Sequence, residues 1–100
     1  MGKVLWLATG VFFGHISKKN QLWNKYGKHV GLLNEKGQVF APDGSYVAEV
    51  LNDRLIVNSK NRALTSTPFI PKPSMIGMPS YLPTSPIELP EGYEAYLPLV

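Results

Sequence analysis

The 100-residue sequence contains no cysteine, which excludes disulfide bonds and thiolate metal sites. A chain without such cross-links must be stabilised by packing, and 44% hydrophobic against 17% charged residues is an ordinary globular balance. The length fits one small domain. Because the absence of cysteine also suits a reducing compartment, we expect a cytoplasmic protein.

Long hydrophobic runs are absent as well. The most apolar stretch, "VLWLATGVFF" at residues 4–13, is far shorter than the roughly twenty residues that span a bilayer. Only Lys3 precedes it as a positive charge, and no A-x-A-like cleavage site follows it. We therefore expect neither a transmembrane segment nor a signal peptide.

Acidic residues are scarce in the first two thirds of the chain. Residues 1–67 hold nine of the ten Lys/Arg and four of the seven Asp/Glu, which gives this part a net charge of +5. Residues 68–100 hold only Lys72 against three glutamates, which gives −2. The two parts can therefore attract each other, within one chain or between neighbouring chains.

Proline is almost missing before residue 68, where only Pro42 occurs, but residues 68–100 hold the other eight prolines. Regular strand ladders do not tolerate this density, so we expect residues 68–100 to form an extended arm. Fourteen apolar or aromatic side chains distinguish the arm from a disordered linker. We expect it to dock on its own domain first, on a neighbouring subunit of a homo-oligomer second, and on a foreign protein partner last.

A 17-residue repeat runs without gaps through four copies of residues 1–67. The substitutions within each column keep side-chain size or backbone character, and the fourth copy is the most diverged. The aligned columns are Leu5/Leu22/Val39/Ile56, Trp6/Trp23/Phe40/Val57, Gly10/Gly27/Gly44/Asn61, Phe13/Val30/Val47/Leu64 and Gly14/Gly31/Ala48/Thr65.

Each copy has the pattern of a β-hairpin, in which a strand such as "QLWN" leads into a polar turn and a second strand such as "HVGLL". The turn column holds glycine or asparagine, the residues that most readily adopt positive φ, so Gly10, Gly27, Gly44 and Asn61 are predicted structural turn residues. The small-residue column, Gly14, Gly31, Ala48 and Thr65, predicts close contact between the second strand and a neighbouring backbone.

Four hairpins of equal spacing predict an all-β domain, a closed ring with pseudo-fourfold symmetry over residues 1–67, because closure removes exposed sheet edges. A straight four-rung solenoid is the alternative. The units "LWNKYGKHVGLL" and "VFAPDGSYVAEV", followed by a proline-rich tail, resemble the bacterial 4-fold β-flower family. The resemblance covers the whole chain, with G-x-x-V-[GA] clearest at Gly27–Gly31 and Gly44–Ala48, and it implies four petal-like hairpins but no biochemical activity.

No catalytic, cofactor-binding or metal-binding residues are predicted. The two histidines, His15 and His29, occupy different repeat positions, and two ring nitrogens without paired carboxylates make a poor metal site. Asp43 and Asp53 lie beside turns, which explains them better than acid–base catalysis does. The glycines recur for hairpin reasons and form no phosphate loop. The sequence therefore predicts a non-enzymatic structural or protein-interaction module.

The alternative is a domain that binds a ligand or an anionic surface, either lipid or nucleic acid. Its contacts would be aromatic residues near the ring axis or a basic rim of residues that lie mostly in turns, namely Lys18, Lys19, Lys25, Lys28, Lys36, Lys60 and Arg62. Nucleic-acid or membrane binding is the less favoured outcome, because lysines on turns are the usual solvated surface. The candidate contact residues are Trp6, Trp23, Lys25, Lys28 and His29.

Overall fold

The computed structural model describes residues 3–74 and 80–96 and shows an all-β chain. It contains one short 3-10 helix, η1 (Ser59–Asn61). None of the helical structure in the described residues is long and apolar enough to cross a membrane. The strands are β1 (Lys3–Leu7), β2 (Phe12–Ile16), β3 (Gln21–Asn24), β4 (His29–Leu33), β5 (Gln38–Phe40), β6 (Tyr46–Leu51), β7 (Arg54–Asn58) and β8 (Tyr93–Ala95).

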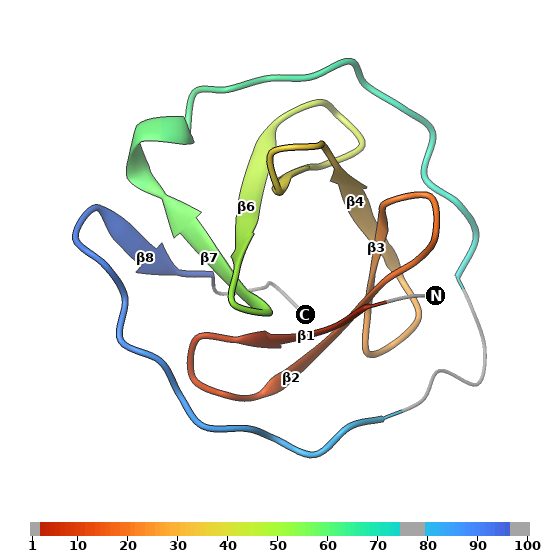
Figure 1. The fold of residues 1–100 in the computed structure, drawn as a ribbon. Coiled ribbons are helices and arrows are strands. Elements are labelled where there is room, and N and C mark those ends of the chain that lie inside the picture. The colour runs from red at the N-terminus through yellow and green to blue at the C-terminus, as the bar shows by residue number, and fades with distance from the viewer. Residues whose placement is uncertain (1–2, 75–79, 97–100) are drawn as a thin grey trace.

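Strands β1 to β7 form a closed barrel, drawn as the central ring in Figure 1. Each strand pairs antiparallel with the next, and β1 closes the barrel by pairing parallel with β7 through Trp6↔Arg54 and Leu7↔Leu55. In such a meander every strand reverses direction, so the first and seventh strands run the same way and can only close in parallel. Closure leaves none of these seven strands as a free sheet edge along its whole length.

The first three 17-residue copies fold into hairpins with one shared register. The cross-strand partners lie at the same repeat positions, and each hairpin has an irregular step one residue later. The β-hairpin character predicted for this part of the chain is therefore confirmed in residues 3–51. The equivalent pairs are Leu5↔Gly14 in β1–β2, Leu22↔Gly31 in β3–β4 and Val39↔Ala48 in β5–β6.

The fourth copy does not form the expected hairpin. Residues 62–67 contain no strand, and their only bridge joins Thr65 to Ser45. Strand β8, from the proline-rich part of the chain, pairs with β7 instead and sets Ala95 opposite Ile56. The hairpin register would have placed β-branched Thr65 where the other copies bury Gly14, Gly31 or Ala48, so a small residue from elsewhere occupies this pairing position.

A shorter connection between β6 and β7 also breaks the repeat. Asn52 and Asp53 both have positive φ, at 49° and 63°, as in a two-residue hairpin turn. The β6–β7 pair Glu49↔Ile56 is consequently displaced by one residue from the β4–β5 pair Leu32↔Phe40. A slip of one residue exchanges the two faces of a strand, so Leu55 and Val57, rather than Ile56, join the main core cluster.

The hydrophobic core is built from the inward side chains of the barrel. Leu5, Leu22, Val39 and Leu55 are fully buried members of one cluster, and Leu33 and Tyr96 pack at its border. A second group of buried aromatic side chains includes Phe12, whose ring centroid lies 5.5 Å from that of Tyr81 in the arm. The arm therefore supplies part of the cover for aromatic residues of the barrel.

Candidate functional site

The chain after η1 passes around the outside of the barrel, as the described segments in Figure 1 show. Two hairpin tips accept equivalent backbone hydrogen bonds from it. At the β5–β6 tip, Ser66 N donates to Gly44 O (2.8 Å) and Phe69 N to Pro42 O (2.9 Å). At the β1–β2 tip, the carbonyls at the same repeat positions are used.

The donors at the β1–β2 tip lie 18 residues further along the chain. Thr84 N donates to Gly10 O (2.8 Å) and Ile87 N to Ala8 O (2.9 Å). The two contacts are equivalent, because at both tips the acceptors lie two residues apart and the donors three residues apart. The hairpin tips are thus binding sites for the chain's own backbone.

The turn glycines serve both the turn and this contact. Gly10, Gly27 and Gly44 have φ values of +94°, +83° and +91°. A Cβ on Gly10 would overlap the Thr84 carbonyl oxygen, and one on Gly44 would overlap that of Ser66. Asn61, the fourth residue of this column, lies in η1 and is not among the residues of positive φ.

In the small-residue column, the first three copies again differ from the fourth. A Cβ on Gly14 would overlap the carbonyl oxygen of Trp23, and one on Gly31 would overlap that of Phe40. Ala48 is fully buried at the equivalent position. Thr65 is exposed and lies outside the barrel wall, because the fourth copy lacks its second strand.

Trp6 is held against the arm rather than free on the barrel surface. Its indole Nε1–H donates to Leu82 O (3.0 Å). The guanidinium of Arg54 lies 5.7 Å from its ring centroid and donates to Ser85 O (2.9 Å). These contacts favour arm docking, not ligand binding, as the role of Trp6.

Trp23 and His29 form a buried stack under the arm. Both residues are only 4% exposed, and their ring centroids lie 4.8 Å apart. The ring centroid of Phe69 lies 5.6 Å from that of His29. His29 Nδ1 accepts a hydrogen bond from Lys72 N (2.9 Å), which requires this nitrogen to be unprotonated. Burial lowers the pKa of His29, because the charged imidazolium loses solvation there.

The two candidate lysines of the β3–β4 turn lie apart from this stack. Lys28 is exposed, and Lys25 is placed with its ammonium 5.4 Å from the ring centroid of exposed Tyr26. The main chain of this turn is fixed by Asn24, whose Oδ1 accepts hydrogen bonds from Tyr26 N and Lys28 N. Lys25 and Lys28 therefore do not share a site with Trp23 and His29.

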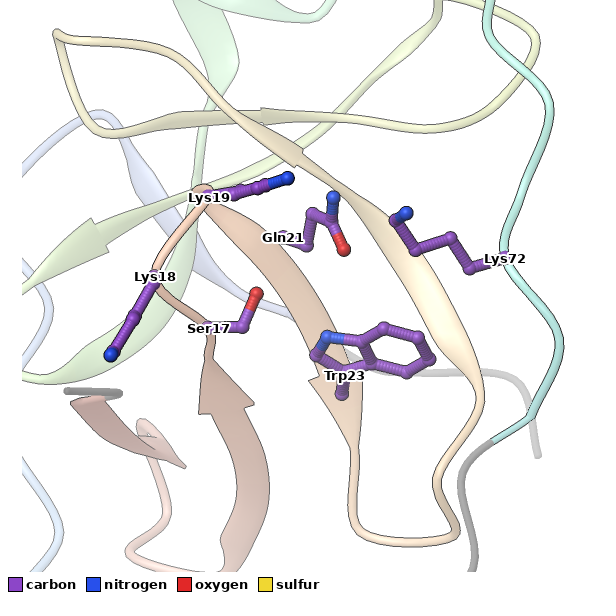
Figure 2. A pocket seen from close by; sticks show the side chains of 6 residues that line it. All are labelled: Ser17, Lys18, Lys19, Gln21, Trp23 and Lys72. Carbon is purple, nitrogen blue, oxygen red and sulfur yellow. The ribbon is translucent and has the colours of Figure 1, made fainter.

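A pocket of about 370 Å³ lies beside Trp23, between the β2–β3 connection on one side and Lys72 of the arm on the other. We call it the lysine pocket. In Figure 2, Lys19 and Lys72 extend toward Gln21 from opposite sides, whereas Lys18 extends away. The lining residues are Ser17, Lys18, Lys19, Gln21, Trp23 and Lys72.

Sequence reasoning found only part of this pocket. Trp23 was a predicted contact residue, and Lys18 and Lys19 belong to the predicted basic rim. Lys72 had no signal, because it reaches the pocket from the arm, 43 residues after its hydrogen-bond partner His29. In the described residues, no cluster of three or more His, Cys, Asp or Glu side chains has the arrangement of a metal site.

Comparisons of the chain with protein-family models, with curated proteins and with solved structures found no match. The fold and the pocket define a small closed β-barrel with an extra arm strand and a basic surface pocket. Its function is therefore inferred from the residues of this chain.

Proposed function

We propose that this chain is a non-enzymatic structural or protein-interaction module whose proline-rich arm docks in cis on a 17-residue-repeat barrel. The observation that carries the proposal is the equivalent pair of backbone hydrogen bonds at the β1–β2 and β5–β6 tips. Repeated backbone contacts of this kind fix the path of the arm without depending on one side chain.

The cis arrangement is also supported by strand β8, which covers the part of the β7 edge that β1 leaves unpaired. Strand β1 pairs with Arg54 and Leu55, and β8 pairs with residues 56–58. Arg62 and Glu94 add an ion pair beside this junction. A docked β8 would block edge-to-edge association of the barrel.

The non-enzymatic part of the proposal rests on the structural tasks of the acidic and imidazole groups. Asp43 Oδ1 accepts hydrogen bonds from Ser45 N and Oγ, which hold the β5–β6 turn. Asp53 pairs with Lys3 at 3.0 Å, and Glu49 accepts from Tyr46 and Asn61. Each of these groups has a structural partner, and His29 holds the arm.

We also propose that the chain is a relative of the 4-fold β-flower proteins, with β7 and β8 forming the fourth petal. Support comes from the sequence resemblance and from Ile56↔Ala95, which joins the fourth member of the strand column to a small residue. In this arrangement the arm would complete a pseudo-fourfold ring that residues 1–67 leave one strand short.

A protein partner would contact the outward side of the arm. Ile70 is 91% exposed and Leu82 is 85% exposed, although both belong to a segment that is otherwise held on the barrel. Because the backbone path is already fixed, binding of these aliphatic side chains would cost side-chain entropy but little further backbone entropy. The arm would then serve both as a clasp and as the contact surface.

The proposal is tested by hydrogen exchange and light scattering on the full-length chain. We expect the amides of Ser66, Phe69, Thr84 and Ile87 to be protected, and the mass to remain that of a monomer at all concentrations. Unprotected arm amides on a folded barrel would contradict docking. A dimer with protected arm amides would instead show exchange of arms between chains.

A further inference from the structure

We propose that the lysine pocket binds a small organic phosphate, with the phosphate group between Lys19 and Lys72 and the organic part against Trp23. The site goes beyond the structural role proposed above and does not depend on it. The shared chemistry is a phosphate monoester or diester, which a free metabolite or a lipid headgroup could supply.

The charge of the pocket is of one sign. Its lining contains three lysines and no carboxylate, and none of these lysines forms a salt bridge within residues 3–74 and 80–96. The salt bridges in the described residues are Lys3–Asp53 and Arg62–Glu94, which involve no residue of the pocket. Two ammonium groups directed at one space therefore lack a counterion from the described protein, and an anion would supply it.

The polar groups of the pocket also offer hydrogen-bond donors. Trp23 is only 4% exposed, and its Nε1–H has no hydrogen-bond partner in the described residues. Figure 2 shows this nitrogen on the edge of the indole nearest Gln21. A buried, unpaired donor is unfavourable, and a phosphate oxygen entering beside Gln21 would accept from it once the Trp23 side chain turns its Nε1–H toward the pocket.

The size and lining of the pocket favour an organic phosphate over a bare ion. A volume of about 370 Å³ exceeds what one phosphate needs and lies at the lower end of small-molecule sites. The methylene stems of Lys19 and Lys72 provide most of the apolar wall between the charges, and the 4% of Trp23 that is exposed adds an edge of the indole. A ligand with both a phosphate and a flat or aliphatic portion would use both kinds of surface.

A second pocket in the next repeat provides an internal comparison. It measures about 180 Å³ and is also closed by the chain after η1, but no lysine lines it. Asn34 and Phe40 stand where the lysine pocket has Ser17 and Trp23, 17 residues earlier. The chain after η1 can therefore pack beside a repeat without basic residues, so such packing does not require the lysines of the lysine pocket.

Lys72 connects ligand binding with the arm. Its backbone N–H is fixed by His29 Nδ1, while its side chain extends into the pocket, and Lys19 approaches from the barrel. A phosphate held between the two ammonium groups would join arm and barrel at this point. Ligand binding should therefore slow amide exchange at Lys72.

The test is a titration of the full-length chain followed by two-dimensional proton–nitrogen NMR, with adenosine monophosphate and inorganic phosphate as probes. The chain has two tryptophans, so the spectrum contains two indole N–H signals. The Trp23 signal should shift saturably with adenosine monophosphate, with a dissociation constant of about 0.1–1 mM, whereas the Trp6 signal, bonded to Leu82, should not. Weaker binding of inorganic phosphate is expected because it lacks the organic portion.

Two double variants remove the same charge. The test variant combines Lys19→Gln with Lys72→Gln, and the control variant combines Lys36→Gln with Lys60→Gln. Lys36 is the repeat equivalent of Lys19 and does not line the pocket. The first pair should weaken binding by about tenfold or more, and the second by less than about threefold. Equal weakening in both pairs, or no saturable Trp23 shift with any probe, would overturn the proposal.

A vesicle arm separates the two sources of phosphate. Co-sedimentation with phosphatidylglycerol vesicles, compared with phosphatidylcholine vesicles, identifies a lipid headgroup if it is lost in the Lys19/Lys72 variant. Binding of adenosine monophosphate without vesicle binding identifies a free phosphate. Equal affinity for inorganic phosphate and adenosine monophosphate would contradict the organic part of the ligand.

Discussion

Single residues of this protein carry two structural tasks where the arm meets the barrel. Gly10 and Gly44 provide positive φ for a turn and also the space for a carbonyl oxygen of the neighbouring chain segment. Gly37 has φ of +81°, but a Cβ there would meet only Val50 O at 3.8 Å. The three glycines therefore allow the cost of the backbone conformation to be separated from the cost of the contact.

We expect Gly37→Ala to lower the free energy of unfolding by about 1–2 kcal/mol, the usual cost of a left-handed conformation for alanine. Gly10→Ala should cost at least about 1 kcal/mol more, since its Cβ also displaces Thr84 from the turn. Urea denaturation of both variants measures the difference. Equal losses would show that the arm does not press on the β1–β2 tip in solution.

His29 predicts a pH dependence of stability. Burial holds the pKa of His29 below its ordinary value of 6.5, so the unfolded chain binds the proton more readily than the folded chain. Its contribution to stability is complete above pH 6.5 and is lost as the pH falls from there toward the folded-state pKa. Protonation of Nδ1 would also break the hydrogen bond from Lys72 N.

The measurement is the unfolding free energy of the wild type and of His29→Gln between neutral and mildly acidic pH. The wild type should lose more stability on acidification than His29→Gln. Burial also lowers the pKa of His15, so His15→Gln is needed as the companion variant. A wild-type slope that persists unchanged in His29→Gln would assign the effect to His15 or to other groups.

At the scale of elements, the fourth repeat unit shows how β6, β7 and η1 are joined where a hairpin strand is missing. The hydroxyl of Tyr46 donates to Glu49 Oε1 (2.7 Å) and accepts from Asn58 N (3.0 Å). Asn61 Nδ2 donates to the same carboxylate oxygen at 2.9 Å. Burial is the main cause that raises the pKa of Tyr46, so the hydroxyl remains protonated and able to donate.

Tyr46→Phe should lower the free energy of unfolding by about 1–3 kcal/mol, because it leaves a part-buried N–H and a carboxylate oxygen short of a partner. Tyr26→Phe is the matched control, since Tyr26 is 63% exposed and should change stability by less than about 0.5 kcal/mol. Thermal and urea unfolding measure both. Similar small losses would mean that Asn58 N–H and Glu49 are satisfied by water.

The elements also show which parts of the fold were predictable. The hairpins of residues 3–51 follow from turn glycines and strand patterns that the sequence displays directly. The register slip at Asn52–Asp53 was not visible, because the gap-free repeat placed Ile56 with Leu5, and only the turn conformation shifts Leu55 into the core. The pairing of β8 with β7 was not visible either, because Tyr93–Ala95 lies in the proline-rich part of the chain, after eight of its nine prolines, where no regular strand was expected.

At the scale of the whole molecule, the proposed clasp predicts that the barrel and the arm are one cooperative unit. Phe12 contacts Tyr81, and Phe13 contacts Tyr96 with ring centroids 5.7 Å apart. Removing residues 68–100 would expose these barrel aromatics and the β7 edge at residues 56–58. Exposed aromatic surface and an open strand edge both favour self-association.

We therefore expect residues 1–67 alone to be unfolded or oligomeric and the full chain to be a folded monomer. Light scattering and circular dichroism on both chains measure this. A chain ending at Tyr96, which keeps β8, is the control and should remain folded. If residues 1–67 form a monomer as stable as the full chain, the docked arm is not part of the stabilising architecture.

In the candidate site, as in the fold, residues placed by local patterns were predictable and residues placed by the arm were not. Trp23 was predictable as a repeated aromatic, and Lys18 and Lys19 as turn lysines, because local patterns reveal both. Lys25, Lys28 and His29 are neighbours in sequence, yet His29 is buried under the arm while the two lysines remain outside. The lysine pocket needs Lys72, whose position depends on the path of the arm.

The sequence alone determined the all-β class, the hairpin spacing and the glycine positions, because turn conformation and strand alternation are local properties of a few adjacent residues. Tertiary structure decided the closure of the seven-stranded barrel by the parallel β1–β7 pair, the recruitment of β8 and the placement of Lys19 and Lys72 around one pocket. These features join residues far apart in the chain. Their geometry depends on register and packing summed over the whole barrel, which no short stretch of sequence displays.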